Sequence, residues 1–128
     1  MVGLVIVSHS WKIAEGVKDL ALQMTPGYDS IIAAGGLADK EIGTDAMLIK
    51  DAIIKANNGD GVVILADLGS GIMSAETAID LLEEDIPVKL ADAPIVEGAI
   101  AAAVEAATGG SIDDVAAEAE DARTVNKL

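Results

Sequence analysis

The sequence predicts an α/β domain: an open three-layer sandwich with a mainly parallel four-stranded sheet in the order 2-1-3-4 and helices on both faces. Short apolar runs rich in β-branched residues, such as residues 2–7, are typical of strands buried on both faces. These runs alternate with amphipathic helical stretches, an order that yields parallel strands. The 128 residues fit one domain, 1–128, because no repeat, linker or low-complexity segment divides them.

Each element follows from local residue spacing and from the turn residues that bound it. Strands are expected at residues 2–7, 30–34, 62–66 and 87–90. Helices are expected at residues 13–24, 44–56, 72–82 and 94–107, with a last helix after Ser111. Thr44 and Ser111 are the expected N-caps, because a hydroxyl oxygen accepts hydrogen bonds from the free N–H groups of a helix start.

The stretch 94–107 is apolar on almost every side, because Glu97 and Glu105 are its only charged residues. A helix of this kind must be buried on more than one side. A small domain has few such places, so we expect this helix to lie at a subunit interface. The alternative is an Ala-rich helix that is partly exposed.

Composition and charge exclude several classes of function. Twenty-two acidic and eight basic residues give a net charge of −14, which argues against nucleic acid and anionic membrane partners. The absence of cysteine excludes disulfides and thiolate sites, and a single histidine argues against a dedicated transition-metal site. Magnesium held by oxygen ligands alone stays an alternative, although no cluster of carboxylates supports it. The N-terminal apolar run is too short for a signal peptide and no run is long enough to span a membrane, so we expect a cytoplasmic protein.

Ligands of open α/β sheets bind outside the carboxyl ends of the strands, where the strand order reverses. His9, the only histidine, follows the first expected strand and therefore lies at that edge. Imidazole can act there as a nucleophile, an acid–base group or a metal ligand near neutral pH. The alternative is a histidine that only makes local hydrogen bonds at a strand end.

Asp67 ends the third strand, which lies beside the first in a 2-1-3-4 order, so it is expected next to His9. A carboxylate on the Nδ1–H group fixes the tautomer and leaves Nε2 as a free nucleophile. It also stabilises the positive ring that forms when Nε2 gains an electrophile. The alternative is an aspartate that caps the following helix.

Three small residues, Gly69, Ser70 and Gly71, open the third helix and would let a phosphate approach its N-terminal N–H groups. An ordinary strand-to-helix turn is the alternative. Gly36 and Thr44 are weaker phosphate-binding candidates, because glycine pairs are common in turns and the threonine can simply cap its helix. Neither a Rossmann fingerprint nor a P-loop is present.

A nucleophilic imidazole, an orienting carboxylate and a phosphate-sized nest without Lys or Arg suit a phosphoryl group held briefly on His9. A receiver domain would need an acidic cluster after the first strand, where Ser8-His9-Ser10 stands. A phosphohistidine mutase or phosphatase would need an arginine at the position of Ser8.

Six segments carry a resemblance to a known family. They are residues 4–10 (LVIVSHS), 34–36 (AGG), 42–45 (IGTD), 67–71 (DLGSG), 74–77 (SAET) and 93–98 (APIVEG). Together they resemble the phosphotransferase subunit of the bacterial dihydroxyacetone kinase, over residues 2 to about 115. That subunit is similar to the mannose-family enzyme IIA domains of the sugar phosphotransferase system.

The resemblance implies a function and its partners. His9 would take a phosphoryl group on Nε2 from the histidine-containing phosphocarrier protein, with Asp67 on Nδ1 and residues 69–71 cradling the phosphoryl oxygens. The group would pass to ADP on the nucleotide-binding subunit of the kinase, so that dihydroxyacetone is phosphorylated at the expense of phosphoenolpyruvate. The family forms homodimers, and neither a tightly bound cofactor nor a metal is implied.

Two features depart from the mannose-family domains of sugar transport; the first argues against strand exchange, and the second favours the kinase. Mannose-family domains exchange a final strand between subunits, whereas residues 111–122 predict a helix here. Those domains also carry a bulky aromatic and a Gly-Gly pair near the aspartate, where this chain has Leu68-Gly69-Ser70-Gly71. The alternatives are a mannose-type enzyme IIA of a sugar transporter and a non-catalytic regulatory domain in which His9 is inert.

Overall fold

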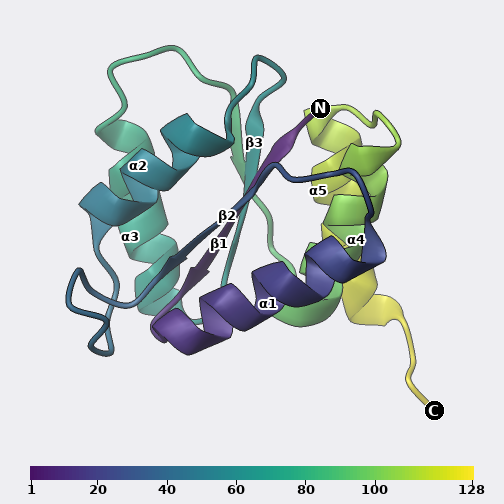
Figure 1. Cartoon of the computed structure of the whole chain (residues 1–128), viewed down its shortest axis with the longest axis horizontal. Coiled ribbons are helices and arrows are strands. Elements are labelled where there is room, and N and C mark those ends of the chain that lie inside the picture. Colours follow the sequence, from purple (N-terminus) through teal and green to yellow (C-terminus); the bar gives the residue numbers. More distant parts are fainter.

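One parallel sheet organises the computed structural model, which describes all 128 residues (Figure 1). Its strands are β1 (Gly3–Ser8), β2 (Ile31–Gly35), β3 (Val62–Ala66) and β4 (Val88–Leu90). They lie in the order β2-β1-β3-β4, and every neighbouring pair is parallel. This order confirms the predicted 2-1-3-4 topology and places β1 and β3 side by side at the centre.

Five α-helices cover the two faces of the sheet (Figure 1). On one face lie α1 (Trp11–Met24), α4 (Ile95–Ala107) and α5 (Ile112–Asp121), and on the other lie α2 (Ala46–Ala56) and α3 (Gly69–Asp80). A 3₁₀ turn at Ala122–Thr124 follows α5. None of these helices is long and apolar enough to cross a membrane.

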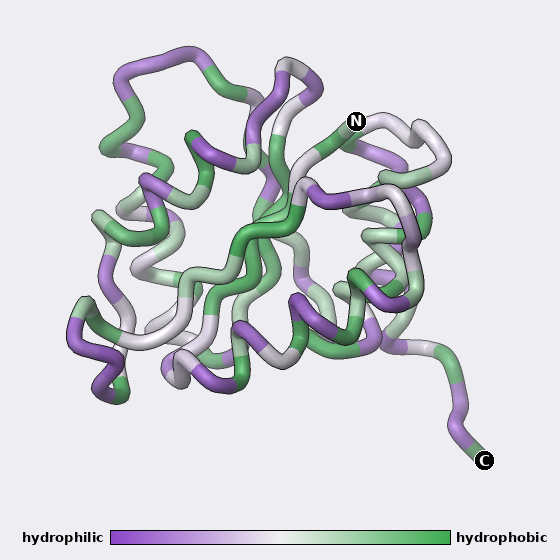
Figure 2. The backbone as a smooth tube through the Cα atoms, viewed as in Figure 1, coloured by the Kyte–Doolittle hydropathy of each residue, from purple (hydrophilic) through white to green (hydrophobic).

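The core is divided by the sheet, because successive side chains of a strand point to opposite faces. Leu4 and Ile6 pack into the cluster under α1, α4 and α5, whereas Val5 and Val7 pack into the cluster under α2 and α3. The central strands therefore read as continuous apolar runs, which Figure 2 shows as green segments through the middle of the molecule.

The expected helix starts needed two corrections. The N-cap of α2 is Asp45, whose carboxylate accepts the Met47 N–H at 2.8 Å, and not Thr44 as predicted. The helix α3 begins at Gly69, so residues 69–71 form its first turn instead of preceding it. Ser111 does cap α5, in a capping box with Asp114.

The apolar helix α4 is covered by its own chain. Its buried face consists of Gly98 and four alanines at helical spacing, packed between α1, α5 and the sheet. Small side chains let these layers approach closely, which accounts for the Ala-rich composition. The prediction that α4 is buried on more than one side is confirmed, but a subunit interface is not needed to explain it.

Candidate functional site

The carboxyl ends of β1 and β3 bring His9 and Asp67 together. The strands pair in register up to Val7 and Ala66, and the Asp67 N–H then donates to the Val7 carbonyl at 3.2 Å. The chain therefore leaves both strands at the same edge of the sheet. There the Asp67 Oδ1 atom lies 2.9 Å from Nδ1 of His9, as the sequence predicted for a pair of adjacent loops.

Four donors converge on the Asp67 carboxylate. Oδ2 accepts hydrogen bonds from the Ser8 hydroxyl at 2.8 Å and from the His9 N–H at 3.0 Å. Oδ1 accepts from the Leu68 N–H at 2.7 Å as well as facing Nδ1 of His9. Because an ionised carboxylate only accepts, this geometry assigns the imidazole proton to Nδ1 and the lone pair to Nε2.

The same contacts keep Asp67 ionised. Burial acts to raise the pKa of its carboxyl group, but the hydrogen bonds from His9, Ser8 and Leu68 outweigh burial and hold the pKa below its usual value. A negative charge next to Nδ1 stabilises any positive charge that develops on the ring. The geometry does not support the alternative in which Asp67 caps α3. The N-cap residue of α3 is Leu68, and no side chain forms a capping hydrogen bond at this helix start.

On its other side, the His9 ring faces the start of α3. The Ser70 hydroxyl contacts Nε2. A Cβ atom on Gly71 would lie 3.2 Å from Asp67 Oδ1 and 3.6 Å from Cε1 of His9, so a glycine lets the helix approach the pair. The first N–H groups of a helix have no acceptor within it, and its dipole favours an anion there. An anionic group on Nε2 would meet the Gly69 and Ser70 N–H groups, whereas the Gly71 N–H already donates to the Leu68 carbonyl at 2.9 Å.

The structure does not bring Gly36 and Thr44 onto the His9 ring. Thr44 Oγ1 is hydrogen-bonded to Ser74 Oγ at 2.7 Å, which ties the start of α2 to α3. The Gly36 N–H donates to the Ser8 carbonyl at 3.0 Å, with φ +70°. Both residues therefore position the loops around the site, and neither hydrogen-bonds His9 or Asp67.

Sequence reasoning missed Ser8. Its side chain is fully buried at the end of β1, donates to Asp67 and accepts the Ser10 N–H at 3.1 Å. The available signal was a single polar residue closing a continuous apolar strand immediately before the histidine. Ser74 lies in one of the six segments that carry the family resemblance, but its hydrogen bond to Thr44 follows only from the packing of α2 on α3.

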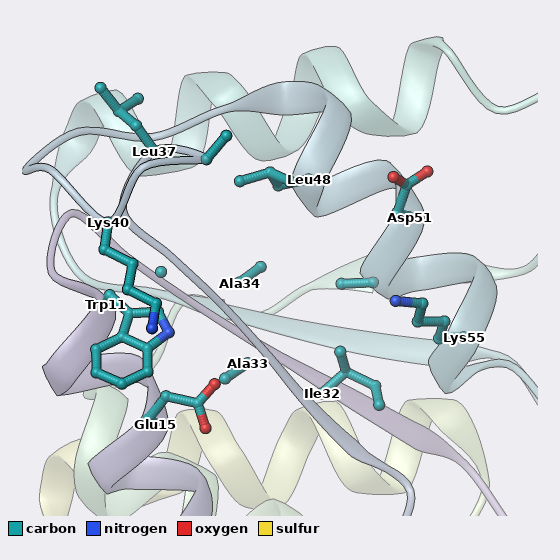
Figure 3. Close-up of a pocket in the computed structure, with 13 residues that line it drawn as sticks. Trp11, Glu15, Ile32, Ala33, Ala34, Leu37, Lys40, Leu48, Asp51 and Lys55 are labelled. Atoms are coloured by element: carbon teal, nitrogen blue, oxygen red, sulfur yellow. The ribbon is translucent and has the colours of Figure 1, made fainter.

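A separate hollow of about 290 Å³ lies between α1, the β2 edge and α2 (Figure 3). Its lining includes Trp11, Leu37 and Lys40 but neither His9 nor Asp67. The Lys40 ammonium group lies 4.1 Å from the centre of the Trp11 ring, in a cation–π contact. Trp11 therefore holds the loop between β2 and α2 against the start of α1.

A family model described as the fructose IIA component of the phosphotransferase system, of the mannose enzyme IIA type, matches residues 3–116. This chain belongs to that family. A crystal structure of the protein of unknown function EF1359 has the same fold, with a TM-score of 0.83, 39% identity, and coverage of 94% of this chain and 93% of that one. The family resemblance drawn from the six sequence segments is confirmed.

Three relatives of this enzyme IIA domain carry a more specific name. The phosphoryl donor subunit DhaM of PEP-dependent dihydroxyacetone kinase 2 from Listeria innocua is 40% identical, over 92% of this chain and 96% of that protein. The corresponding subunit of Escherichia coli K12 is 48% identical over 90% of the chain, and that of Providencia stuartii 45% identical over 95%. The chain spans only 25% and 27% of the length of these last two proteins.

Proposed function

We propose that this chain is the phosphoryl-carrying component of a phosphoenolpyruvate-dependent dihydroxyacetone kinase, with His9 as the covalent carrier. One observation carries the proposal: the Asp67 carboxylate holds Nδ1 at 2.9 Å, which leaves the Nε2 lone pair facing the N-terminus of α3. The donor would be the histidine-containing phosphocarrier protein. The acceptor would be ADP on the nucleotide-binding subunit of the kinase.

Each transfer is a displacement at phosphorus. Nε2 of His9 attacks the phosphorus on the donor imidazole; the new N–P bond forms as the donor N–P bond breaks, and the donor histidine leaves neutral. In the second transfer a β-phosphate oxygen of ADP attacks, the bond to His9 breaks and ATP forms. Asp67 stabilises the charged ring, and the N–H groups of Gly69 and Ser70 with the Ser70 hydroxyl supply donors to the phosphoryl oxygens. Gly71, whose N–H donates to the Leu68 carbonyl, completes the cradle by letting the helix approach the ring. No Lys or Arg lies in residues 67–74, so the group is held loosely enough to move on.

The names of the three relatives support the kinase assignment, and the Listeria innocua protein supports it over nearly its whole length. The fructose wording of the family model favours a second candidate, the enzyme IIA component of a sugar transporter. The Asp67 loop argues for the kinase, because Leu68-Gly69-Ser70-Gly71 stands where the resemblance implies a bulky aromatic and a Gly-Gly pair in sugar-transport domains.

Reconstitution separates the two candidates. Phosphoenolpyruvate, enzyme I, the phosphocarrier and the chain are combined with either the two other kinase subunits or membranes that carry a mannose-type permease. We expect dihydroxyacetone phosphate to form with the wild-type chain and none to form with His9→Ala. Sugar phosphorylation by the membranes without turnover of dihydroxyacetone contradicts the kinase assignment.

We further infer that the chain acts in the cytoplasm as a single carrier domain, 1–128, within a homodimer, and that it binds no cofactor or metal tightly. Its phosphoryl group is held by a covalent bond, so transfer needs only the two protein partners.

A further inference from the structure

The turn between α2 and β3 carries the sequence Asn57-Asn58-Gly59-Asp60-Gly61, and residues 58–60 are exposed. The chain has three asparagines, of which only Asn58 is followed by a glycine. An asparagine in that position can react with its own backbone, because the nitrogen of the next residue lies close to the side-chain amide carbon. The turn therefore combines the sequence and the exposure that this reaction needs.

Gly59 leaves its backbone nitrogen open to attack that amide carbon. Its φ of +109° lies in a region that glycine adopts readily and other residues avoid. A Cβ atom on Gly59 would meet no atom within 4 Å, so the peptide group borders open solvent. Any residue other than glycine would place a side chain beside the attacking nitrogen.

The side-chain amide of Asn58 contacts a hydroxyl group at the atom that would leave. Nδ2 donates to the Oγ atom of Ser30, immediately before β2, at 3.2 Å. When the amide carbon is attacked, this nitrogen must gain a proton before it can depart as ammonia. The Ser30 hydroxyl can supply that proton, because a hydroxyl donates as well as accepts.

The neighbouring Asn57 provides a contrast. It is the C-cap of α2, and its N–H donates to the Ile53 carbonyl at 3.1 Å. Its side chain is engaged as well, because Oδ1 accepts the Gly59 N–H at 3.1 Å. That N–H must leave Asn57 before it can lose its proton, and an exposed hydrogen bond of this kind exchanges readily with water. The residue after Asn57 is Asn58, whose side chain shields the nitrogen from the Asn57 amide.

We propose that Asn58 is a site of spontaneous deamidation. The Gly59 nitrogen loses its proton and attacks Cγ of Asn58, and the new C–N bond closes a succinimide ring as the Cγ–Nδ2 bond breaks and ammonia leaves. Water then adds to one of the two ring carbonyls and opens the ring. Opening at one carbonyl gives aspartate, and opening at the other gives isoaspartate, in which the main chain runs through the side-chain carbonyl.

The modification changes the fold at a place remote from the phosphoryl site. The turn lies at the edge of the sheet where β3 begins, whereas His9 follows the opposite, carboxyl end of β1. Either product adds one negative charge two residues from Asp60, in a chain of net charge −14. Isoaspartate also lengthens a turn whose end is fixed, because the Gly61 carbonyl accepts the Gly3 N–H at 3.0 Å. The modified protein should therefore be less stable but transfer phosphoryl groups as before.

Peptide mapping by mass spectrometry tests the proposal on the full chain, incubated at mildly alkaline pH. Deamidation raises the mass of the fragment that contains Asn58 by one unit, and an isoaspartyl methyltransferase labels the isoaspartate product. Asn58→Gln and Asn57→Gln form a matched pair, since each replaces one amide by another without changing charge. Gly59→Ala tests the need for glycine, and Ser30→Ala tests the hydroxyl contact.

In wild type we expect the mass gain at Asn58 and none at Asn57 or Asn126. Asn57→Gln should keep the gain at residue 58, and Asn58→Gln should abolish it. Gly59→Ala should slow the reaction by about tenfold or more, because alanine obstructs the nitrogen and resists the backbone rotation. Ser30→Ala should slow it by about twofold or more, because the leaving nitrogen loses its proton donor.

The proposal is overturned if Asn58 gains no mass, if Asn57 and Asn126 react as fast as Asn58, or if the gain persists in Asn58→Gln. Because Asn58→Gln keeps the glycine, it decides the matter even where Gly59→Ala disturbs the turn. An unchanged or faster reaction in Ser30→Ala would contradict the role of the hydroxyl. Loss of phosphoryl transfer in proportion to the isoaspartate content would contradict the separation of the two sites.

Discussion

Asp67 is held by more contacts than any other side chain of the site. Two backbone N–H groups, the Ser8 hydroxyl and the His9 ring all meet its carboxylate. The imidazole therefore has one defined tautomer and one defined orientation. The sequence predicted that Asp67 pairs with His9, because this pairing follows from the strand order. It did not predict the hydrogen bond from Ser8, because that bond depends on the direction in which the Ser8 side chain points at the end of β1.

Replacing the carboxylate by an amide tests its electronic role. In Asp67→Asn, either amide orientation sets an NH₂ group against a backbone N–H, of His9 or of Leu68, and the charge that stabilises a phosphorylated ring is lost. We expect the rate of phosphoryl transfer from the carrier to fall by about 10² to 10⁴-fold. A loss of less than tenfold in stopped-flow transfer would contradict an orienting role.

The lowered pKa of Asp67 predicts how the stability of the folded protein changes with pH. Hydrogen bonds hold its pKa below the ordinary value in the folded state, so its stabilisation is complete above the unfolded pKa of about 3.9 and is lost as the pH falls through the folded pKa. Thermal unfolding of wild type and Asp67→Asn should therefore differ most at pH 5–7 and converge below pH 4. A constant difference down to pH 2 would be inconsistent with this cause.

Ser8 is predicted to act on His9 through Asp67. Ser8→Ala removes the donor to Oδ2 and leaves the Ser10 N–H without its acceptor, at a cost of about 1–3 kcal/mol in unfolding free energy. The transfer rate should fall, and its acidic limb should move to higher pH, because the carboxylate loses a hydrogen bond that lowers its pKa. A pH profile identical to wild type after loss of stability alone would show that Ser8 is merely structural.

Among the elements, α1 and β2 set the position of the His9 loop. A Cβ atom on Gly35 would lie 2.6 Å from the Ser10 carbonyl oxygen and 2.9 Å from the Trp11 Cα atom, so the strand end and the helix start are in backbone contact. The helix α1 then begins at Trp11, with the Ser10 hydroxyl accepting the Ile13 N–H at 3.3 Å.

Two glycine substitutions test this contact. Gly35→Ala should push α1 off the sheet, destabilise the fold by about 1–3 kcal/mol and slow transfer to His9. Gly16→Ala, in the exposed middle of α1 with nothing near its missing side chain, should stabilise by about 0.5–1 kcal/mol and leave transfer unchanged. Calorimetry and the transfer assay on both variants check this, and equal effects would contradict it.

The predicted bounds of an element agree with the structure where the apolar pattern alone determines them. An example is β3, which was predicted at residues 62–66 and has these bounds in the structure. The bounds were predicted less well at helix starts. Asp45 takes the cap of α2 because Thr44 is engaged by Ser74, a contact that joins residues 30 positions apart. Such competition between caps is decided by tertiary packing and leaves no trace in local spacing.

For the whole molecule, the three layers explain why α4 is both apolar and Ala-rich. The structure buries its small face against α1 and α5, and leaves Val96 and Val104 37% and 45% exposed. Periodicity could show that α4 is buried on several sides but not which chain covers it, because covering elements of one chain and of a partner leave the same pattern.

The oligomeric state is a prediction at this scale. The family resemblance implies a homodimer, so sedimentation equilibrium should give twice the chain mass of 12.9 kDa. The mass of a single chain at micromolar concentration would show that the carrier works as a monomer.

The central claim is that His9 carries the phosphoryl group, and intact-protein mass spectrometry tests it most directly. After incubation with phosphoenolpyruvate, enzyme I and the phosphocarrier, the account predicts one added phosphoryl group that is lost in acid and is absent from His9→Ala. No mass gain, with the carrier itself shown to be phosphorylated, or a gain that persists in His9→Ala, would contradict the account.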